Sequence, residues 1–374
     1  MTESEDPRER VEAPAAERPA EPSAHPEPEP PEPTPEPPPL PTARELISVG
    51  LELAYRSRRS IRNASLAIGL QLLAAVGPLV LLLIVVATKA PTALEGFANG
   101  VPPEPGSPEE PILASFAVTF IVAILAFGLL AVESRIIAAG ILGGEAAGRP
   151  IVPHEGLRRS RQVFWRVVAA TVVVQVPLAF VANLAEGLVS PILGGSQEAL
   201  VLVGLVVSTL LTVPFAYVLT GIVLGGAPPV EAIRRSIRLA RVRWRLAVVA
   251  AIAEALTQTL LILGLGAGLD VIATLATGLG LGIESGPLGT FATLALALLG
   301  TAAVGSLWFT VAAIAAAPQV VAFVGLTRYT AGMDAARDGS ATRGVRWVSI
   351  PMAIGIVLGL LASIGGVSAA MRAV

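Results

Sequence analysis

Long apolar runs are the feature that most restricts what this chain can fold into. A helix needs about 20 residues to cross roughly 30 Å of hydrocarbon, and inside lipid only helices or closed barrels satisfy every backbone polar group. Seven such runs occur in the chain, at about 64–88, 112–132, 164–185, 198–224, 246–267, 291–326 and 347–370. The sequence therefore predicts an all-α, polytopic transmembrane helical bundle.

The last two runs differ from a simple span. The sixth is too long, and we expect Pro318 to kink it or to separate it from an entry segment. The seventh is rich in glycine and would add a C-terminal span to the first six. We expect a tail over 1–42, a six-span membrane domain over 43–340 and an additional C-terminal span within 341–374.

Composition agrees with a membrane protein. Charged residues make up 14% of the chain, against about 25% in ordinary soluble domains. The absence of cysteine excludes disulfides, thiolate metal sites and a cysteine nucleophile. Basic charge in so apolar a chain is typical of cytoplasmic loops rather than of nucleic-acid contacts. We expect no nucleic-acid partner.

Lysine and arginine predict the orientation. With the N-terminus in the cytoplasm, segments 43–63, 133–166, 225–245 and 327–346 carry 5, 6, 6 and 4 bases. The opposite side carries only Lys89 and Arg372. Positive charge is enriched on the cytoplasmic side of membrane proteins, so the N-terminus is expected inside and, with seven spans, the C-terminus outside. The arginine-rich, lysine-poor composition hints at a GC-rich bacterial genome, hence a bacterial cytoplasmic (inner) membrane.

The tail over 1–42 contains 14 prolines and opens with acidic residues, which is not typical of a secretory signal. Such a segment has too little apolar surface to fold and should be disordered with polyproline II character. It is either an acidic spacer or a docking arm for a proline-reading protein partner.

The tripeptide RRS occurs three times on the predicted inner side, ending at Ser60, Ser160 and Ser236. Each copy precedes an odd-numbered span, so the six spans form three loose hairpin repeats. Helical spacing predicts basic amphipathic interfacial segments with the serine on the buried face and the arginines toward headgroups or cytosol. In the third copy the expected apolar stripe is Val230, Ile233, Ile237, Ala240 and Trp244.

Two interpretations of RRS stay open. The motif is either a membrane-border element or a specific site for anionic lipid headgroups, which basic clusters attract at about 1 kcal/mol per residue. The arginines of this candidate lipid border are Arg58, Arg59, Arg158, Arg159, Arg234 and Arg235.

An acidic residue lies deep in the fifth span. Glu254 is nine residues beyond Arg245, about 13 Å into the membrane at 1.5 Å per residue. An ionisable residue at that depth suggests function. Gln258 shares its helix face, and Gln71, Gln175 and Gln319 are polar residues of other spans that could line the same interior. Glu254, Gln258 and Gln175 are the candidate intramembrane site; alternatively, Glu254 only packs helices together.

No catalytic pattern accompanies this site. The chain has two histidines, no G-x-S-x-G serine and no phosphate-binding G-x-x-x-x-G-K-[ST] loop. We expect no enzymatic activity, metal or cofactor. The glycine pairs 264/268 and 278/282 have small-xxx-small spacing and predict close helix packing.

Three segments of the chain resemble a known family of membrane proteins. They are PVEAIRRSIRLARVRWRLAVVAAIAEAL, PHEGLRRSRQVFWRVVAA and VVAFVGLTRYTAGMDAARDG. The chain resembles the glycerophosphoryl diester phosphodiesterase membrane-domain family over about 43–340. The resemblance implies a six-span bacterial membrane domain. The phosphodiesterase domain that some members carry is absent here, so their activity is not implied.

Two functions follow as hypotheses. The first is a non-enzymatic integral inner-membrane protein with a lipid- or envelope-related role. The second is a transporter or permeation protein with a polar intramembrane site around Glu254.

Overall fold

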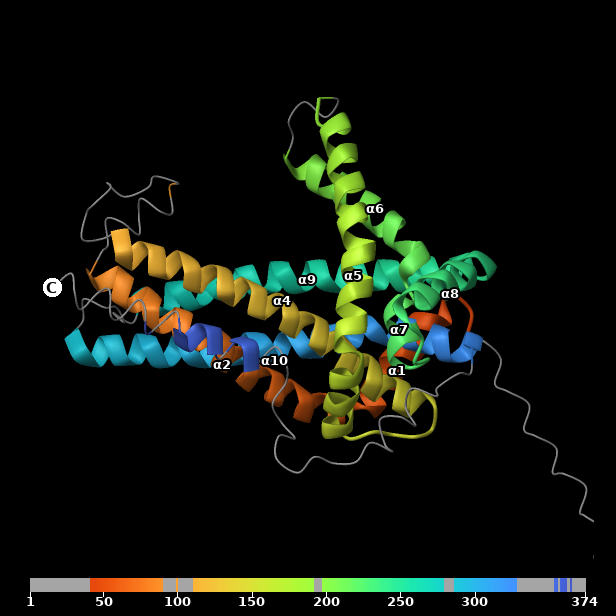
Figure 1. Cartoon of the computed structure of the whole chain (residues 1–374), viewed down its shortest axis with the longest axis horizontal. Coiled ribbons are helices and arrows are strands. Elements are labelled where there is room, and N and C mark those ends of the chain that lie inside the picture. Colours follow the sequence, from red (N-terminus) through yellow and green to blue (C-terminus); the bar gives the residue numbers. More distant parts are fainter. Residues whose placement is uncertain are drawn as a thin grey trace, which may run out of the picture. The chain divides into compact units, whose positions relative to one another are not determined.

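The computed structural model describes residues 41–89, 99, 110–191, 197–278, 286–327, 353–355, 357–361 and 364. Within these residues every regular element is a helix, as predicted (Figure 1). Six helices of this part are long and apolar enough to cross a membrane, so the chain is a multi-pass membrane protein. The predicted tail falls almost entirely outside the described residues.

The helices begin with a short amphipathic one. Helix α1 (Glu45–Arg56) buries Leu46, Gly50, Leu53 and Ala54. It ends at Ser57, whose N–H donates to Leu53 O at 3.0 Å. Helix α2 (Arg58–Lys89) follows at once and includes the first predicted span. The first RRS motif therefore lies at the start of a spanning helix, not within a separate interfacial helix.

The second pair of long helices is α4 (Glu110–Ala146) and α5 (Pro153–Val189). They are joined by a turn at Gly148, whose φ of 66° is in the left-handed region that favours glycine. Helix α5 is continuous from its first arginines to its apolar end, so the second RRS motif also lies within a spanning helix.

The fourth predicted span is broken. Helix α6 (Gln197–Thr212) gives way to a 3₁₀ turn, η1 (Val213–Phe215), and then to α7 (Val218–Val223). Pro214 has no N–H to donate, which explains the interruption. Three other prolines of predicted spans, Pro78, Pro177 and Pro318, lie inside continuous helices.

Helices α8 (Pro229–Val242), α9 (Trp244–Gly278) and α10 (Gly286–Thr327) complete the described bundle. The sixth span is thus one 42-residue helix, and the expected separation at Pro318 is wrong. Helix α10 packs along α2, α4 and α9 (Figure 1). In the apolar stretch of α10 that could cross the membrane, 56% of the residues are buried inside the protein, against 17% in α5. Helix α10 is therefore central in the bundle and α5 is peripheral.

The third RRS motif is the only described copy in a separate amphipathic helix, α8, and the buried face of this helix agrees with the predicted stripe in part. Ser236 and Ala240 are buried as predicted, together with Ala232, whereas Val230 and Trp244 are 61% and 59% exposed. Small residues allow α8 to approach η1 and α7 closely. Val230 in the first turn of α8 and Trp244 at the start of α9 are therefore not part of the buried face.

Close helix packing occurs at glycines other than those predicted. A Cβ added to Gly305 of α10 would lie 2.9 Å from Leu72 Cβ and 3.0 Å from Gly69 Cα of α2. A Cβ on Gly264 would meet nothing within 4 Å, so the predicted packing role is wrong there. The packing of positions 268, 278 and 282 lies outside what the structure describes.

Most of the predicted seventh span also falls outside the described residues. Its described part nevertheless lies beside two spanning helices. A Cβ on Gly355 would be 2.9 Å from Ala75 Cβ and 3.1 Å from Ala126 Cβ. A Cβ on Gly359 would be 3.3 Å from Pro78 Cγ. This segment therefore packs against α2 and α4.

Candidate functional site

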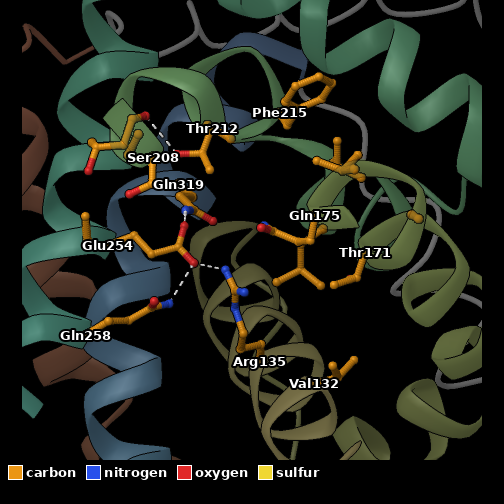
Figure 2. Close-up of a pocket in the computed structure, with 18 of the residues that line it drawn as sticks. Val132, Arg135, Thr171, Gln175, Ser208, Thr212, Phe215, Glu254, Gln258 and Gln319 are labelled. Atoms are coloured by element: carbon orange, nitrogen blue, oxygen red, sulfur yellow. Dashed lines mark hydrogen bonds and ion pairs between the residues drawn. The ribbon is translucent and has the colours of Figure 1, made fainter. Parts of the chain in front are cut away.

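Glu254 is held by side chains from three helices. Its Oε1 accepts a hydrogen bond from Gln258 Nε2 at 3.1 Å, one turn further along α9. The same oxygen forms an ion pair with Arg135 of α4, and Oε2 accepts a hydrogen bond from Gln319 of α10 (Figure 2). Both carboxylate oxygens of Glu254 therefore have a donor as partner.

Arg135 was not predicted as part of this site, because it was counted among the six bases of the cytoplasmic segment 133–166. It instead lies inside α4, within the candidate span 117–146. The sequence did contain a signal, since the apolar run continues beyond it through Ile136 and Ile137 to Gly144. Removing Arg135 leaves 20 bases against two, so the predicted orientation does not depend on it.

The ion pair borders a cavity of about 390 Å³. Part of each charged side chain remains accessible, 35% for Arg135 and 20% for Glu254. Gln175 of α5 extends into this cavity and points toward the pair (Figure 2). The structure therefore brings together the three predicted site residues, Glu254, Gln258 and Gln175, and adds Gln319 and Arg135.

Gln71 does not join them. It is buried in α2 beside Ile68, Ile137 and Leu157, and it is absent from the lining of the cavity. Residues on different helices share an interior only if their helices are rotated toward the same point, which sequence spacing within one span does not specify.

Hydroxyl groups form much of the remaining polar lining. Ser208, Thr209 and Thr212 lie on the cavity side of α6, and Thr171 and Thr259 lie on α5 and α9. The α6 hydroxyls donate to carbonyl oxygens of their own helix, Ser208 and Thr209 to Leu205 O at 3.1 and 2.6 Å and Thr212 to Thr209 O at 2.8 Å. Their oxygen lone pairs remain able to accept hydrogen bonds from a ligand.

Another wall of the cavity is formed by the broken span. Phe215 and Ala216 at the break, and Val218, Leu219 and Ile222 of α7, line the cavity. Discontinuous helices beside intramembrane sites are a recurring feature of transporters. A second cavity of about 30 Å³ also borders the ion pair and is lined in part by Trp308, and it is large enough to hold a water molecule.

The arginines of the candidate lipid border do not share one environment. Arg58, Arg59 and Arg234 are exposed, while Arg158 and Arg235 are half-buried. Arg235 pairs with Glu231 at 2.9 Å. Arg159 differs from the prediction, because it is buried and donates to carbonyl oxygens of α7. It is not available to lipid headgroups.

The three RRS serines also differ from one another. Ser160 and Ser236 are buried as predicted, and Ser160 Oγ donates to Glu133 Oε1 at 3.2 Å. Ser60 is only half-buried. In the first copy the buried serine is Ser57, at the joint between α1 and α2.

Among the described residues, no group of three His, Cys, Asp or Glu side chains could hold a metal ion. No protein-family model, curated protein or solved structure matches the chain. The resemblance to the glycerophosphoryl diester phosphodiesterase membrane-domain family therefore stays a prediction.

Proposed function

We propose that this protein binds a small polar solute without net charge in the cavity beside Arg135 and Glu254, and passes it across a bacterial cytoplasmic membrane. Of the two functions suggested by the sequence, the cavity favours the second, a transporter or permeation protein. The absence of enzymatic activity and the cytoplasmic position of the N-terminus remain predictions within this proposal.

One observation carries the proposal: polar side chains are accessible at membrane depth. Gln175 and Gln258 are both exposed and both line the cavity. Gln258 is 13 residues beyond Arg245, about 20 Å along the helix. An uncompensated amide in hydrocarbon costs several kcal/mol. These side chains are therefore expected to face water or a polar ligand rather than lipid tails.

The charge of the site supports a ligand without net charge. Arg135 and Glu254 cancel one another, so the site is neutral when empty. Adding a net charge to a low-dielectric interior is costly, whereas a zwitterion or a polyol adds none. The guanidinium, the glutamine amides and the hydroxyl oxygens offer such a ligand both donors and acceptors.

Site-directed labelling tests the proposal, because the chain contains no cysteine. Gln258→Cys and Ser208→Cys should react with a charged, membrane-impermeant thiol reagent in right-side-out or inverted vesicles. Leu260→Cys is the matched control, since Leu260 lies on the same helix and is 68% exposed but does not line the cavity. It should stay unlabelled. No reaction of either cavity variant from either side would contradict an aqueous path.

Ligand protection and flux then test the ligand class. Glycine and glycerol should slow the labelling of Gln258→Cys and cross proteoliposome membranes that contain the protein, whereas inorganic phosphate should do neither. The double variant Arg135→Gln/Glu254→Gln removes both charges together and avoids leaving one charge unpaired. It should lose protection by glycine while keeping that by glycerol. Protection by phosphate alone would overturn the assignment of a net-neutral ligand.

A further inference from the structure

Two of the RRS motifs each contribute one buried polar residue to the broken span. Ser236 of the third motif is 1% exposed and Arg159 of the second is 5% exposed. They come from different helices, α8 and α5, and lie 77 positions apart in the chain. Both bind backbone groups of the segment 213–223, which consists of η1, α7 and the two residues between them.

Ser236 lies at the start of this segment. Its Oγ accepts a hydrogen bond from Tyr217 N at 3.0 Å and donates one to Pro214 O at 2.8 Å. Where a helix breaks inside a membrane protein, backbone N–H and C=O groups at the break lose their hydrogen-bond partners within the helix. One serine hydroxyl can act as both donor and acceptor, so Ser236 compensates both sides of the break.

Arg159 lies at the end of the segment. Its Nε donates to Val223 O at 2.9 Å and its Nη2 donates to Ile222 O at 3.2 Å. These are carbonyl groups of the last turn of α7, where a cation also interacts favourably with the helix dipole. Nη1 donates to Gln162 Oε1 at 3.2 Å, which holds the guanidinium in place from its own helix.

We propose that Arg159 and Ser236 are positioning residues that hold segment 213–223 as a wall of the cavity. The role of this wall in solute binding rests on the proposed function. The segment contributes Phe215, Val218, Leu219 and Ile222 to the lining. A wall without fixed ends would change the shape of the cavity although neither residue touches a ligand. Arg159 and Ser236 then serve the broken span rather than the membrane border.

The first RRS motif supplies matched controls, because it lies at the start of α2, a helix that has no break of this kind. Arg59 occupies the motif position of Arg159 and is exposed, and Ser60 occupies that of Ser236. In hydrogen–deuterium exchange of the full-length protein, Arg159→Gln and Ser236→Ala should each lower the protection of amides in 217–223 by about tenfold, the size expected for losing such hydrogen bonds. Arg59→Gln and Ser60→Ala should leave it unchanged.

A second readout separates positioning from general destabilisation. In the same samples, exchange where α2 crosses α10 should stay normal. When Arg159→Gln or Ser236→Ala is combined with Ser208→Cys, the labelling of that cysteine and its protection by glycine should change. Arg159→Lys and Ser236→Thr, which keep a donor, should restore most of the protection and remain informative if the harsher variants fail to fold.

The two proposals fail in different ways. Equal exchange in the variants and in the first-motif controls, or a uniform loss across all helices, would overturn the positioning role while leaving solute binding intact. Altered exchange with no labelling at any cavity position would instead overturn solute binding and leave the anchoring of the segment standing.

Discussion

Just before α1, Thr42 and Glu45 form reciprocal hydrogen bonds. Thr42 N donates to Glu45 Oε2 at 2.9 Å, and Glu45 N donates to Thr42 Oγ1 at 3.4 Å. This is a capping box, which compensates backbone N–H groups at a helix start. The hydrogen bond from the Thr42 N–H, and secondly the interaction of the carboxyl with the Thr42 hydroxyl, lowers the pKa of Glu45 below its usual value of 4.5.

The lowered pKa of Glu45 predicts that the start of α1 loosens in acid. A carboxyl with a lowered folded pKa contributes stability that is fully present above its usual pKa of 4.5 and is lost as the pH falls through the folded pKa. Hydrogen exchange at residues 45–48 should therefore speed up in acid, after correction for its intrinsic pH dependence. Glu45→Gln should remove this extra dependence, and a wild-type profile identical to that of the variant would contradict the role of the carboxylate.

At the scale of elements, the crossing of α2 and α10 depends on the absence of side chains. Gly305→Ala would bring a methyl group within 3.0 Å of α2, and overpacking of this kind costs about 1–3 kcal/mol. Gly300→Ala on the same helix meets nothing within 4 Å and should be neutral or slightly stabilising, since alanine favours helix more than glycine. Unfolding of the two variants in detergent measures the difference, and equal stabilities would show that the crossing adjusts freely.

We expect helix α8 to contact anionic lipid headgroups. Arg234, Arg238 and Arg241 are exposed on one face, between Val230 and Val242, which are 61% and 74% exposed. This mixture is typical of a helix at the membrane interface. The triple variant with Gln at these arginines should retain less anionic than zwitterionic lipid in native mass spectrometry, whereas the triple Lys variant should match the wild type. An unchanged lipid ratio in both would exclude α8 as the lipid contact.

At the scale of the whole molecule, the orientation of the N-terminus and the number of spans together determine on which side the C-terminus lies. The distribution of positive charge predicts that the N-terminus lies inside, and the described part of 353–361 packs against α2 and α4 as a further span would. Reporter fusions should therefore place residue 1 in the cytoplasm and residue 374 outside. A cytoplasmic C-terminus would mean that the chain has six spans and that this last segment does not cross.

The helical spans and a polar position at Glu254 could be predicted from the sequence because both depend on local properties. Twenty apolar residues must satisfy their own backbone in lipid, and Glu254 is buried to a depth that its distance from Arg245 sets. The contact between Gln258 and Glu254 could be predicted as well, because the two residues lie one turn apart on the same helix.

Only the tertiary structure decided which groups meet. Whether Gln175 rather than Gln71 faces Glu254, whether Arg135 pairs with it, and whether Arg159 and Ser236 face lipid or the break at Pro214 all depend on how helices rotate and cross. The three copies of the RRS motif accordingly lie in three different environments. A helix fixes the angle between its own residues, but the packing of small side chains against neighbouring helices sets the direction in which that pattern faces.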